Sequence, residues 1–266
     1  MAKETKETKE TKEITIKQDA GALAALQGAF TPQENPGLTA QDILIAKVLL
    51  MQFMSDAVTE GNASAGDFVD SVTGELLGSF KKPLAFIPFH LTKTFIEYED
   101  IGTEKKYLRI IPIDSNPMSK GFNDSLPYEE TVDGKHIVRD RAMNVYVLDP
   151  LNPELPPRII TFRRTSLKAG KQLATGMYVR NASKKLPPYA FIWELCARLE
   201  SNDKGKYYVF ESKSTETIIN SELIETIKYW IKQVSSKSIK EDTSDIVETK
   251  VGSGTTVTDE VGSGAF

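Results

Sequence analysis

Cysteine and histidine are scarce in this chain, which has one cysteine, Cys196, and two histidines, His90 and His136, among 266 residues. A single cysteine excludes an internal disulfide and a zinc site made of cysteines, and it is typical of a reducing cytoplasm. The two histidines do not stand at a spacing that metal sites use. We therefore expect no metal, no cofactor and a cytoplasmic location.

Long apolar runs and enzyme motifs are also missing. The longest apolar segment, ILIAKVLLMQFM, is interrupted by Lys47 and Gln52, so we expect no membrane-spanning helix. The N-terminal MAKETKETKETKE is charged and is unlike a secretory signal. The GKQ at 170–172 lacks the flanking residues of a phosphate-binding loop, and no Gly-x-Ser-x-Gly precedes a helix. The sequence therefore predicts a protein that is not an enzyme.

A third absence is local, because residues 158–185 contain no Asp or Glu. The formal net charge of the chain is −4, and residues 241–266, with six acids and one lysine, contribute −5 of it. Subtracting −5 from −4 leaves +1 on residues 1–240. Surface helices usually mix Lys with Glu, so an acid-free stretch indicates an anionic partner. Its basic residues are Arg158, Arg163, Arg164, Lys168, Lys171, Arg180, Lys184 and Lys185.

Composition divides the chain into four segments. Residues 1–37 begin with K-E-T repeats and are expected to be a disordered tail and linker. Residues 38–212 contain short β-like runs separated by turn signals, which predicts an antiparallel barrel or sandwich. Residues 213–236 predict an amphipathic C-terminal helix, and residues 237–266 predict a disordered acidic tail.

The spacing of charged and apolar residues predicts two helices. The first is expected to begin at the N-cap Ser166, with Arg164, Lys168 and Lys171 at i, i+4 and i+7 on one charged face. The second has an apolar stripe that would pack on the barrel or on a second copy of the chain, as in a homo-oligomer. That stripe consists of Ile219, Leu223, Ile227, Trp230 and Val234.

Aromatic residues close to the basic ones are candidate platforms for nucleic-acid bases, because exposed bases stack on side-chain rings. Phe162 lies within the basic segment, Tyr107 neighbours Arg109, and Tyr207 and Tyr208 follow the sequence KGK. Phe191 and Trp193 instead belong to a wholly apolar set, which favours a core position for both. The sequence thus combines a row of cations with candidate stacking rings.

These features together resemble a phage-encoded single-stranded DNA-binding protein of the OB-fold type. The likeness is carried by EGNASAGDFVDSVTGELLG, PRIITFRRTSLKAGKQL, LPPYAFIWEL before NDKGKYYVFE, and the terminal DEVGSGAF. It implies an OB-like antiparallel β-barrel with two helices over residues 38–212 and the segments that flank it. It also implies coating of single strands in replication or recombination, and recruitment of partner proteins through the tail.

The predicted DNA-binding residues are the eight basic residues of 158–185 together with Phe162, Tyr107, Arg109, Tyr207 and Tyr208. Asp259, Glu260 and Phe266 are expected to dock partners and to compete with DNA, although a merely solubilising tail fits its composition equally well. A phage structural or assembly protein with a basic face for a partner is the alternative. A third reading is a nuclease with Mg²⁺ on Glu129, Glu130, Asp133 and Asp140.

Overall fold

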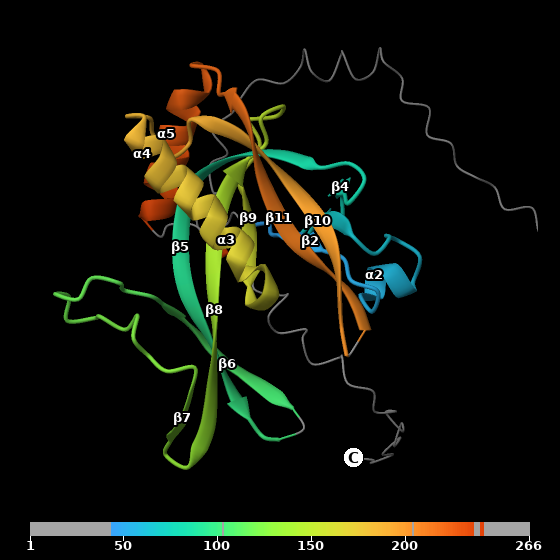
Figure 1. The fold of residues 1–266 in the computed structure, drawn as a ribbon, viewed down its shortest axis with the longest axis vertical. Coiled ribbons are helices and arrows are strands. Elements are labelled where there is room, and N and C mark those ends of the chain that lie inside the picture. Colours follow the sequence, from blue (N-terminus) through green and yellow to red (C-terminus); the bar gives the residue numbers. More distant parts are fainter. Residues whose placement is uncertain (1–43, 103, 204, 237–239, 242–266) are drawn as a thin grey trace, which may run out of the picture. The chain divides into compact units, whose positions relative to one another are not determined.

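The computed structural model describes residues 44–102, 104–203, 205–236 and 240–241, which form a mainly β structure (Figure 1). The strands of its largest sheet are β5 (Leu84–Asp100), β6 (Lys105–Pro112), β7 (Glu129–Val132), β8 (Lys135–Leu148), β9 (Arg158–Arg163), β10 (Phe191–Asn202) and β11 (Gly205–Ile218). Their order is β11-β10-β5-β8-β7, with β6 added to β5 and β9 added to β8. All of these pairings are antiparallel.

The long strands β5 and β8 form a central ribbon that carries different partners at its two ends. At one end β5 pairs with β10 and β8 pairs with β9. At the other end β5 pairs with β6 and β8 pairs with β7. We call the first end, with β9, β10, β11 and the helices, the body. The second end, with β6, β7 and the loop 113–128, is the arm, which extends downward in Figure 1.

A smaller sheet lies beside the body. It contains β2 (Val48–Leu50), β3 (Asp67–Asp70) and β4 (Leu76–Ser79), with the short helix α2 (Asp56–Thr59) between β2 and β3. An isolated parallel bridge between Lys47 and Ile159 joins it to β9. The side chain of Gln52 joins it to β11 by bonding both backbone groups of Tyr208. In addition, β1 (Leu44–Ile45) pairs in parallel with β12 (Lys240–Glu241).

A continuous helical segment connects β9 to β10. It consists of a 3₁₀ turn (Arg164–Ser166), α3 (Leu167–Ala174), a π-helical turn (Thr175–Arg180) and α4 (Asn181–Ser183). Two glycines bring it against aromatic rings, since a Cβ at Gly170 would be 2.7 Å from Phe162 Cβ and one at Gly176 would be 2.4 Å from Trp193 Cη2. Only glycine fits at these two positions without displacing the helix.

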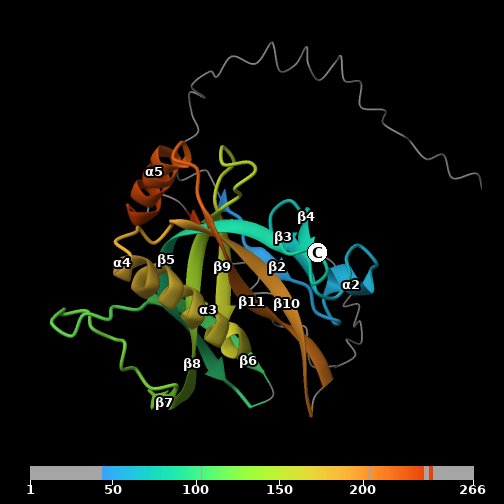
Figure 2. The ribbon, with the colours of Figure 1, turned by 45° about the horizontal axis from the view of Figure 1, so that its top comes forward.

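The two main helices cover different hydrophobic clusters. Leu173 and Met177 of the first helical segment are fully buried with Phe162 and Leu195. On the second cluster, α5 (Leu223–Ser235) packs Ile227 against a group that includes Ile87, Phe89, Tyr146 and Ile159. Figure 2 shows α3 running across the strands of the body, with α5 beside its upper end. The body is thus held by apolar packing on both clusters.

The predicted mainly β class is confirmed. The structure is mainly β, and hairpins turn at Thr73-Gly74, between β5 and β6, and at Asp133-Gly134, where both turn residues have positive φ. None of the helices that the structure describes is long and apolar enough to cross a membrane.

Other predictions need correction or stay untested. The C-terminal helix begins at Leu223 rather than at 213, because β11 continues through Ile218. The apolar stripe of this helix packs on the sheet of its own chain. The ladders of the described residues do not close into a barrel. Residues 1–37 and 242–266 lie outside the described residues.

Candidate nucleic-acid interface

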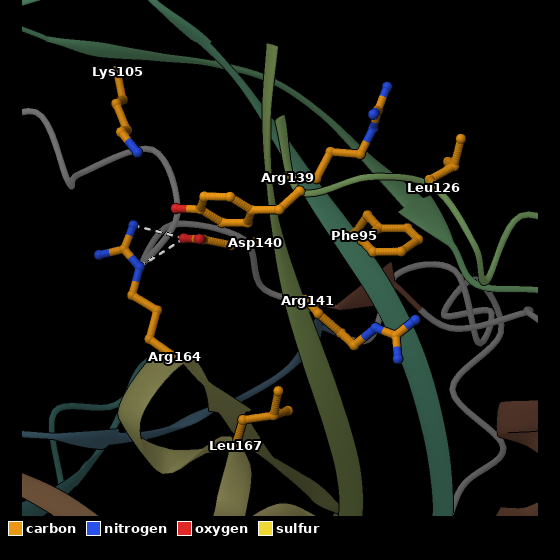
Figure 3. A pocket seen from close by; sticks show the side chains of 9 residues that line it. Phe95, Lys105, Leu126, Arg139, Asp140, Arg141, Arg164 and Leu167 are labelled. Atoms are coloured by element: carbon orange, nitrogen blue, oxygen red, sulfur yellow. Dashed lines mark hydrogen bonds and ion pairs between the residues drawn. The ribbon is translucent and has the colours of Figure 1, made fainter. Parts of the chain in front are cut away.

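A pocket lies at a gap along one edge of β8. That edge pairs with β7 as far as Val138 and with β9 only from Ala142. The three residues between them pair with β5 on the other edge but have no strand partner on this one. The pocket has a volume of about 610 Å³, within the range of small-ligand sites (Figure 3). Its lining residues are Phe95, Lys105, Leu126, Tyr128, Arg139, Asp140, Arg141, Arg164 and Leu167.

Arg164 is oriented toward this pocket by Asp140. Its Nε and Nη2 atoms lie 2.7 and 2.6 Å from Oδ2 of Asp140, and Figure 3 shows both contacts. Burial opposes the charge of Arg164, but the attraction of the Asp140 carboxylate raises the pKa of the guanidinium above its usual value. The backbone of Arg164 is left-handed, with φ at +50°, so the chain turns sharply here before α3 begins.

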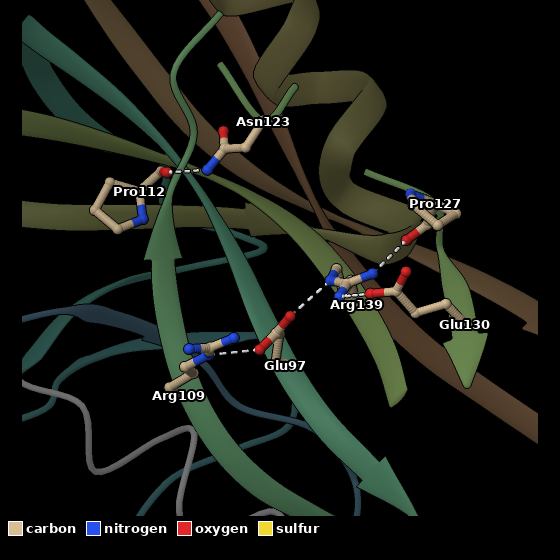
Figure 4. A network of polar contacts seen from close by, with 7 residues as sticks. All are labelled: Glu97, Arg109, Pro112, Asn123, Pro127, Glu130 and Arg139. Carbon is tan, nitrogen blue, oxygen red and sulfur yellow. Dashed lines mark hydrogen bonds and ion pairs between the residues drawn. The ribbon is translucent and has the colours of Figure 1, made fainter. Parts of the chain in front are cut away.

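Arginines of the arm are committed to carboxylates in a network around Glu97 (Figure 4). Arg109 Nε and Arg139 Nε each lie 2.6 Å from a different oxygen of Glu97, whose side chain is 3% exposed. Arg139 also donates to Glu130 and to the carbonyl of Pro127, at 3.2 Å for the latter. Burial would raise the pKa of Glu97, but the two arginines hold it below its usual value. These arginines therefore hold the strands of the arm together.

A second set of contacts ties the loop 113–128 to the ribbon. Arg141 donates to both the carboxylate and the backbone carbonyl of Asp124, at 2.8 Å for the carbonyl. Lys93 Nζ lies 2.6 Å from Ser115 Oγ and 3.7 Å from Asp124. A hydrogen bond from Ser115 and the charge of Arg141 lower the pKa of Asp124. Among the pocket cations, Lys105 has no side-chain partner within the described part of the chain.

The basic segment 158–185 is divided between structural and exposed residues. Arg158 is largely buried and donates to Asp70 at 2.7 Å, while Nη1 of Arg163 is buried. The predicted row of Arg164, Lys168 and Lys171 on one helix face is wrong. Arg164 belongs to the 3₁₀ turn and has a left-handed backbone, so it points to Asp140 instead. The first part of the segment therefore anchors the fold.

The later part of the segment presents its charges to solvent. We call its five exposed cations the basic ridge; they are Lys168, Lys171, Arg180, Lys184 and Lys185. Ala169, Gly170 and Leu173 face the core, so the lysines of α3 face away from it. Among the described residues, the one carboxylate paired with the ridge is that of Glu216, 4.0 Å from Arg180 Nη2. Lys184 Nζ also lies 5.6 Å from the centre of the Phe191 ring.

The candidate stacking rings have different environments. The prediction that Phe162 stacks on bases is wrong, because its side chain is fully buried beneath α3. Tyr107 is partly buried with its ring edge on Tyr98, and Tyr207 donates to Glu200 at 3.2 Å. The ring of Tyr208 lies against two further aromatic rings. Trp193 is in the core as predicted, and Phe191 is partly buried.

Sequence reasoning missed the pocket and assigned other roles to its acids. Arg139, Asp140 and Arg141 lie in the long strand β8, but polar and apolar residues come in blocks in IVRDRAM and do not alternate, so the sequence shows no strand period there. Glu130 and Asp140 are held by arginines rather than facing a metal. The described residues contain no cluster of acids, histidines or cysteines suited to a metal ion.

The predicted partner-binding residues Asp259, Glu260 and Phe266 lie outside the described residues. The fold and the basic ridge define a mainly β protein with a cationic face. The chain belongs to the family of Pam3 phage gp34-like proteins, whose family model matches residues 17–240. Neither the search of curated proteins nor the search of solved structures found a match.

Proposed function

We propose that this protein binds single-stranded DNA without sequence preference, and coats it during phage replication or recombination. The observation that carries the proposal is the basic ridge, five exposed cations in a segment that contains no acid. Each cation beside a phosphate releases condensed counterions, so such a row favours tight, salt-sensitive binding. Ridge and pocket are joined through Arg164 and Leu167, which precede the ridge in the chain.

The order of the strands supports an OB-like arrangement. The series β5, β8, β9, helical segment, β10, β11 pairs in the spatial order β11-β10-β5-β8-β9. An OB fold has this order when its first strand is long and pairs with both the second and the fourth. OB folds bind oligonucleotides on their second and third strands and on the loops after the first and fourth. In this chain the corresponding elements are β8, β9, the arm and the turn before β11.

The acidic segment 242–266 has a proposed role in regulating the same surface. Its charge is opposite to that of the basic ridge, so it would compete with DNA for the ridge and, once displaced, offer Phe266 to replication or recombination proteins. Removal of residues 242–266, which leaves β12 in place, is expected to tighten DNA binding. Unchanged affinity would contradict this regulatory role while leaving DNA binding itself intact.

The test is a fluorescence-anisotropy titration of the full chain against oligo-dT, an RNA of equal length and a duplex, at two salt concentrations. We expect salt-sensitive binding to single strands and weaker binding to the duplex. The variant Lys168→Glu/Lys171→Glu should weaken binding at least about ten-fold at low salt and reduce the salt slope by about 1.4, because each of the two phosphate contacts on a single strand contributes about 0.7. The matched control is Lys228→Glu/Lys232→Glu, which reverses two exposed lysines on α5.

Two outcomes would contradict the proposal. If the wild-type chain, with or without residues 242–266, has no affinity for single strands at low salt, the ridge serves a protein partner of the phage. If the α3 and α5 variants lose affinity equally, the effect is one of net charge rather than of this ridge. Circular dichroism of each variant controls for folding.

A further inference from the structure

Three aromatic side chains from separate parts of the chain meet where the small sheet lies beside β11. Phe53 follows β2, Phe80 follows β4, and Tyr208 belongs to β11. The ring of Tyr208 is stacked against Phe53, with centroids 5.7 Å apart and an interplanar angle of 29°, and is 5.6 Å from the ring of Phe80. We call these three residues the aromatic ledge.

Two of the three rings of the ledge are exposed, and Tyr208 between them is partly buried. Phe53 and Phe80 are 44% and 43% exposed, and Met54, which follows Phe53 in the chain, is 82% exposed. Leu199, which pairs with Tyr208 across the sheet, is 47% exposed. Contiguous exposed apolar surface of this kind marks a binding site more often than single exposed residues do.

The rings are held in position before any ligand arrives. Gln52 accepts a hydrogen bond from the Tyr208 N–H at 2.9 Å and donates one to the Tyr208 carbonyl at 3.0 Å. Beneath the rings, Gly66 has φ at +91°, and a Cβ there would lie 3.0 Å from both Phe80 and Tyr208. A preformed platform loses less conformational entropy on binding than a mobile one.

Lysines surround the ledge. Lys81 Nζ lies 5.3 Å from the centre of the Phe80 ring, and Lys82 next to it is exposed. Lys206 is exposed and lies on the same side of β11 as Tyr208, because residues two apart in a strand share a face. Exposed rings flanked by cations are the combination that single-stranded nucleic acids bind, since bases stack while phosphates are neutralised.

The ledge is also connected to the candidate interface. Phe210, two residues after Tyr208 in β11, donates its N–H to Ser166 Oγ at 3.2 Å. Ser166 ends the 3₁₀ turn that contains Arg164, one of the pocket residues. The edge of β11 therefore leads from the ledge to the start of the basic ridge, which lets one strand of nucleic acid contact both.

We propose that the aromatic ledge stacks the bases of a single-stranded nucleic acid, while Lys81, Lys82 and Lys206 contact its phosphates. This inference rests on the proposed function and adds a binding site on the small sheet to the basic ridge. Stacking on rings tolerates every base, because each base has a π face. The ledge thus supplies a non-electrostatic share of the affinity that remains at high salt.

The experiment distinguishes the stacking of bases on the rings from binding of the phosphate backbone. Phe53→Leu/Phe80→Leu keeps apolar bulk but removes two rings, and it is titrated against oligo-dT and against an abasic strand of equal length. We expect about ten-fold weaker binding to oligo-dT, an unchanged salt slope, and no loss on the abasic strand. Tyr208→Phe should retain the affinity. Phe122→Leu is the matched control, because Phe122 is a 39% exposed phenylalanine in the arm.

The possible results distinguish failure of the ledge from failure of the proposed function. The ledge proposal alone is overturned if the wild type binds oligo-dT, the ridge variant binds it more weakly, and the ledge variant binds it as tightly as the wild type. Equal losses on both strands also overturn it, because bases would then play no part. A wild type that binds neither strand overturns both proposals. Cross-linking of wild-type protein to 5-iodouracil strands, mapped by mass spectrometry, should modify the ledge, and a map confined to other residues would contradict it.

Discussion

The arginines of the arm and the cations of the basic ridge differ in whether carboxylates pair with them. In the arm, Arg109 and Arg139 are bound to Glu97, and Arg141 is bound to Asp124. In the body, the basic ridge has a single carboxylate partner within the described structure, the exposed Glu216. Buried arginine pairs fix geometry, whereas exposed unpaired lysines remain free to neutralise phosphates. Cations that look alike in the sequence can therefore have different roles: those of the arm hold its strands together, and those of the ridge are available to phosphates.

The largest expected effect comes from removing the central arginine of the arm. Arg139→Ala leaves Glu97 buried with one partner in place of two and frees Glu130. Breaking a buried pair in this way should lower the free energy of unfolding by about 3 kcal/mol, measured by urea denaturation. Arg198→Ala, which breaks a pair with Glu200 through a 59% exposed arginine, should cost less than about 1 kcal/mol.

The same Arg139 variant tests whether the arm only supports the fold. If it does, Arg139→Ala should keep its affinity for single strands within about two-fold under conditions where it stays folded. A large loss of affinity with little loss of stability would instead mean that the arm arginines contact nucleic acid. Arg139→Met with Glu97→Met should recover part of the stability, because well-packed apolar residues often replace a buried ion pair without loss.

The next prediction uses pH to loosen the arm while leaving α3 in place. Folding lowers the pKa values of Glu97 and Asp124. The stability that these two carboxylates contribute is therefore complete above their ordinary pKa values, which are about 4. This stability is lost as the pH falls through the lowered values. Amide hydrogen exchange, corrected for its intrinsic rate, should therefore rise in 113–132 below about pH 4 before it rises in α3.

A variant controls for general acid denaturation. Glu97→Gln removes the charge that protonation would remove, so its arm should exchange faster at neutral pH than that of the wild type. The α3 segment contains no carboxylate, so its exchange should be similar in both proteins. Simultaneous exchange of arm and α3 in the wild type would show that the two ends of the ribbon unfold as one unit.

The body and the arm also differ in how far the sequence predicts them. The body's strands follow from the short β-like runs and the turn signals between them, and Lys168 and Lys171 lie on the exposed face of α3, as predicted. The arm pairs residues distant in sequence, such as Glu97 with Arg139, and nothing local in the chain indicates such a pair. Local patterns report local structure, and ion-pair partners depend on the tertiary arrangement.

The sequence predicts the exposed part of the candidate site but not the part whose ion-pair partners are distant in the chain. The acid-free segment identified Lys168, Lys171 and the later ridge residues, which are exposed. It did not separate them from Arg158 and Arg164, whose partners Asp70 and Asp140 lie elsewhere in the chain. Phe162 lies within the same segment, and only the position of α3 shows that its ring belongs to the core.

The smallest expected effect concerns the one carboxylate at the ridge. Glu216 is exposed and lies 4.0 Å from Arg180, so it competes weakly with phosphates for this cation. Glu216→Gln should raise the affinity for oligo-dT about two-fold at low salt and leave it unchanged at high salt, because screening already removes the interaction there. The control Glu225→Gln frees Lys228 on α5 and should leave the affinity unchanged. An equal gain from both variants would mean that overall charge governs binding, and the contrast between a paired arm and an open ridge would lose its functional meaning.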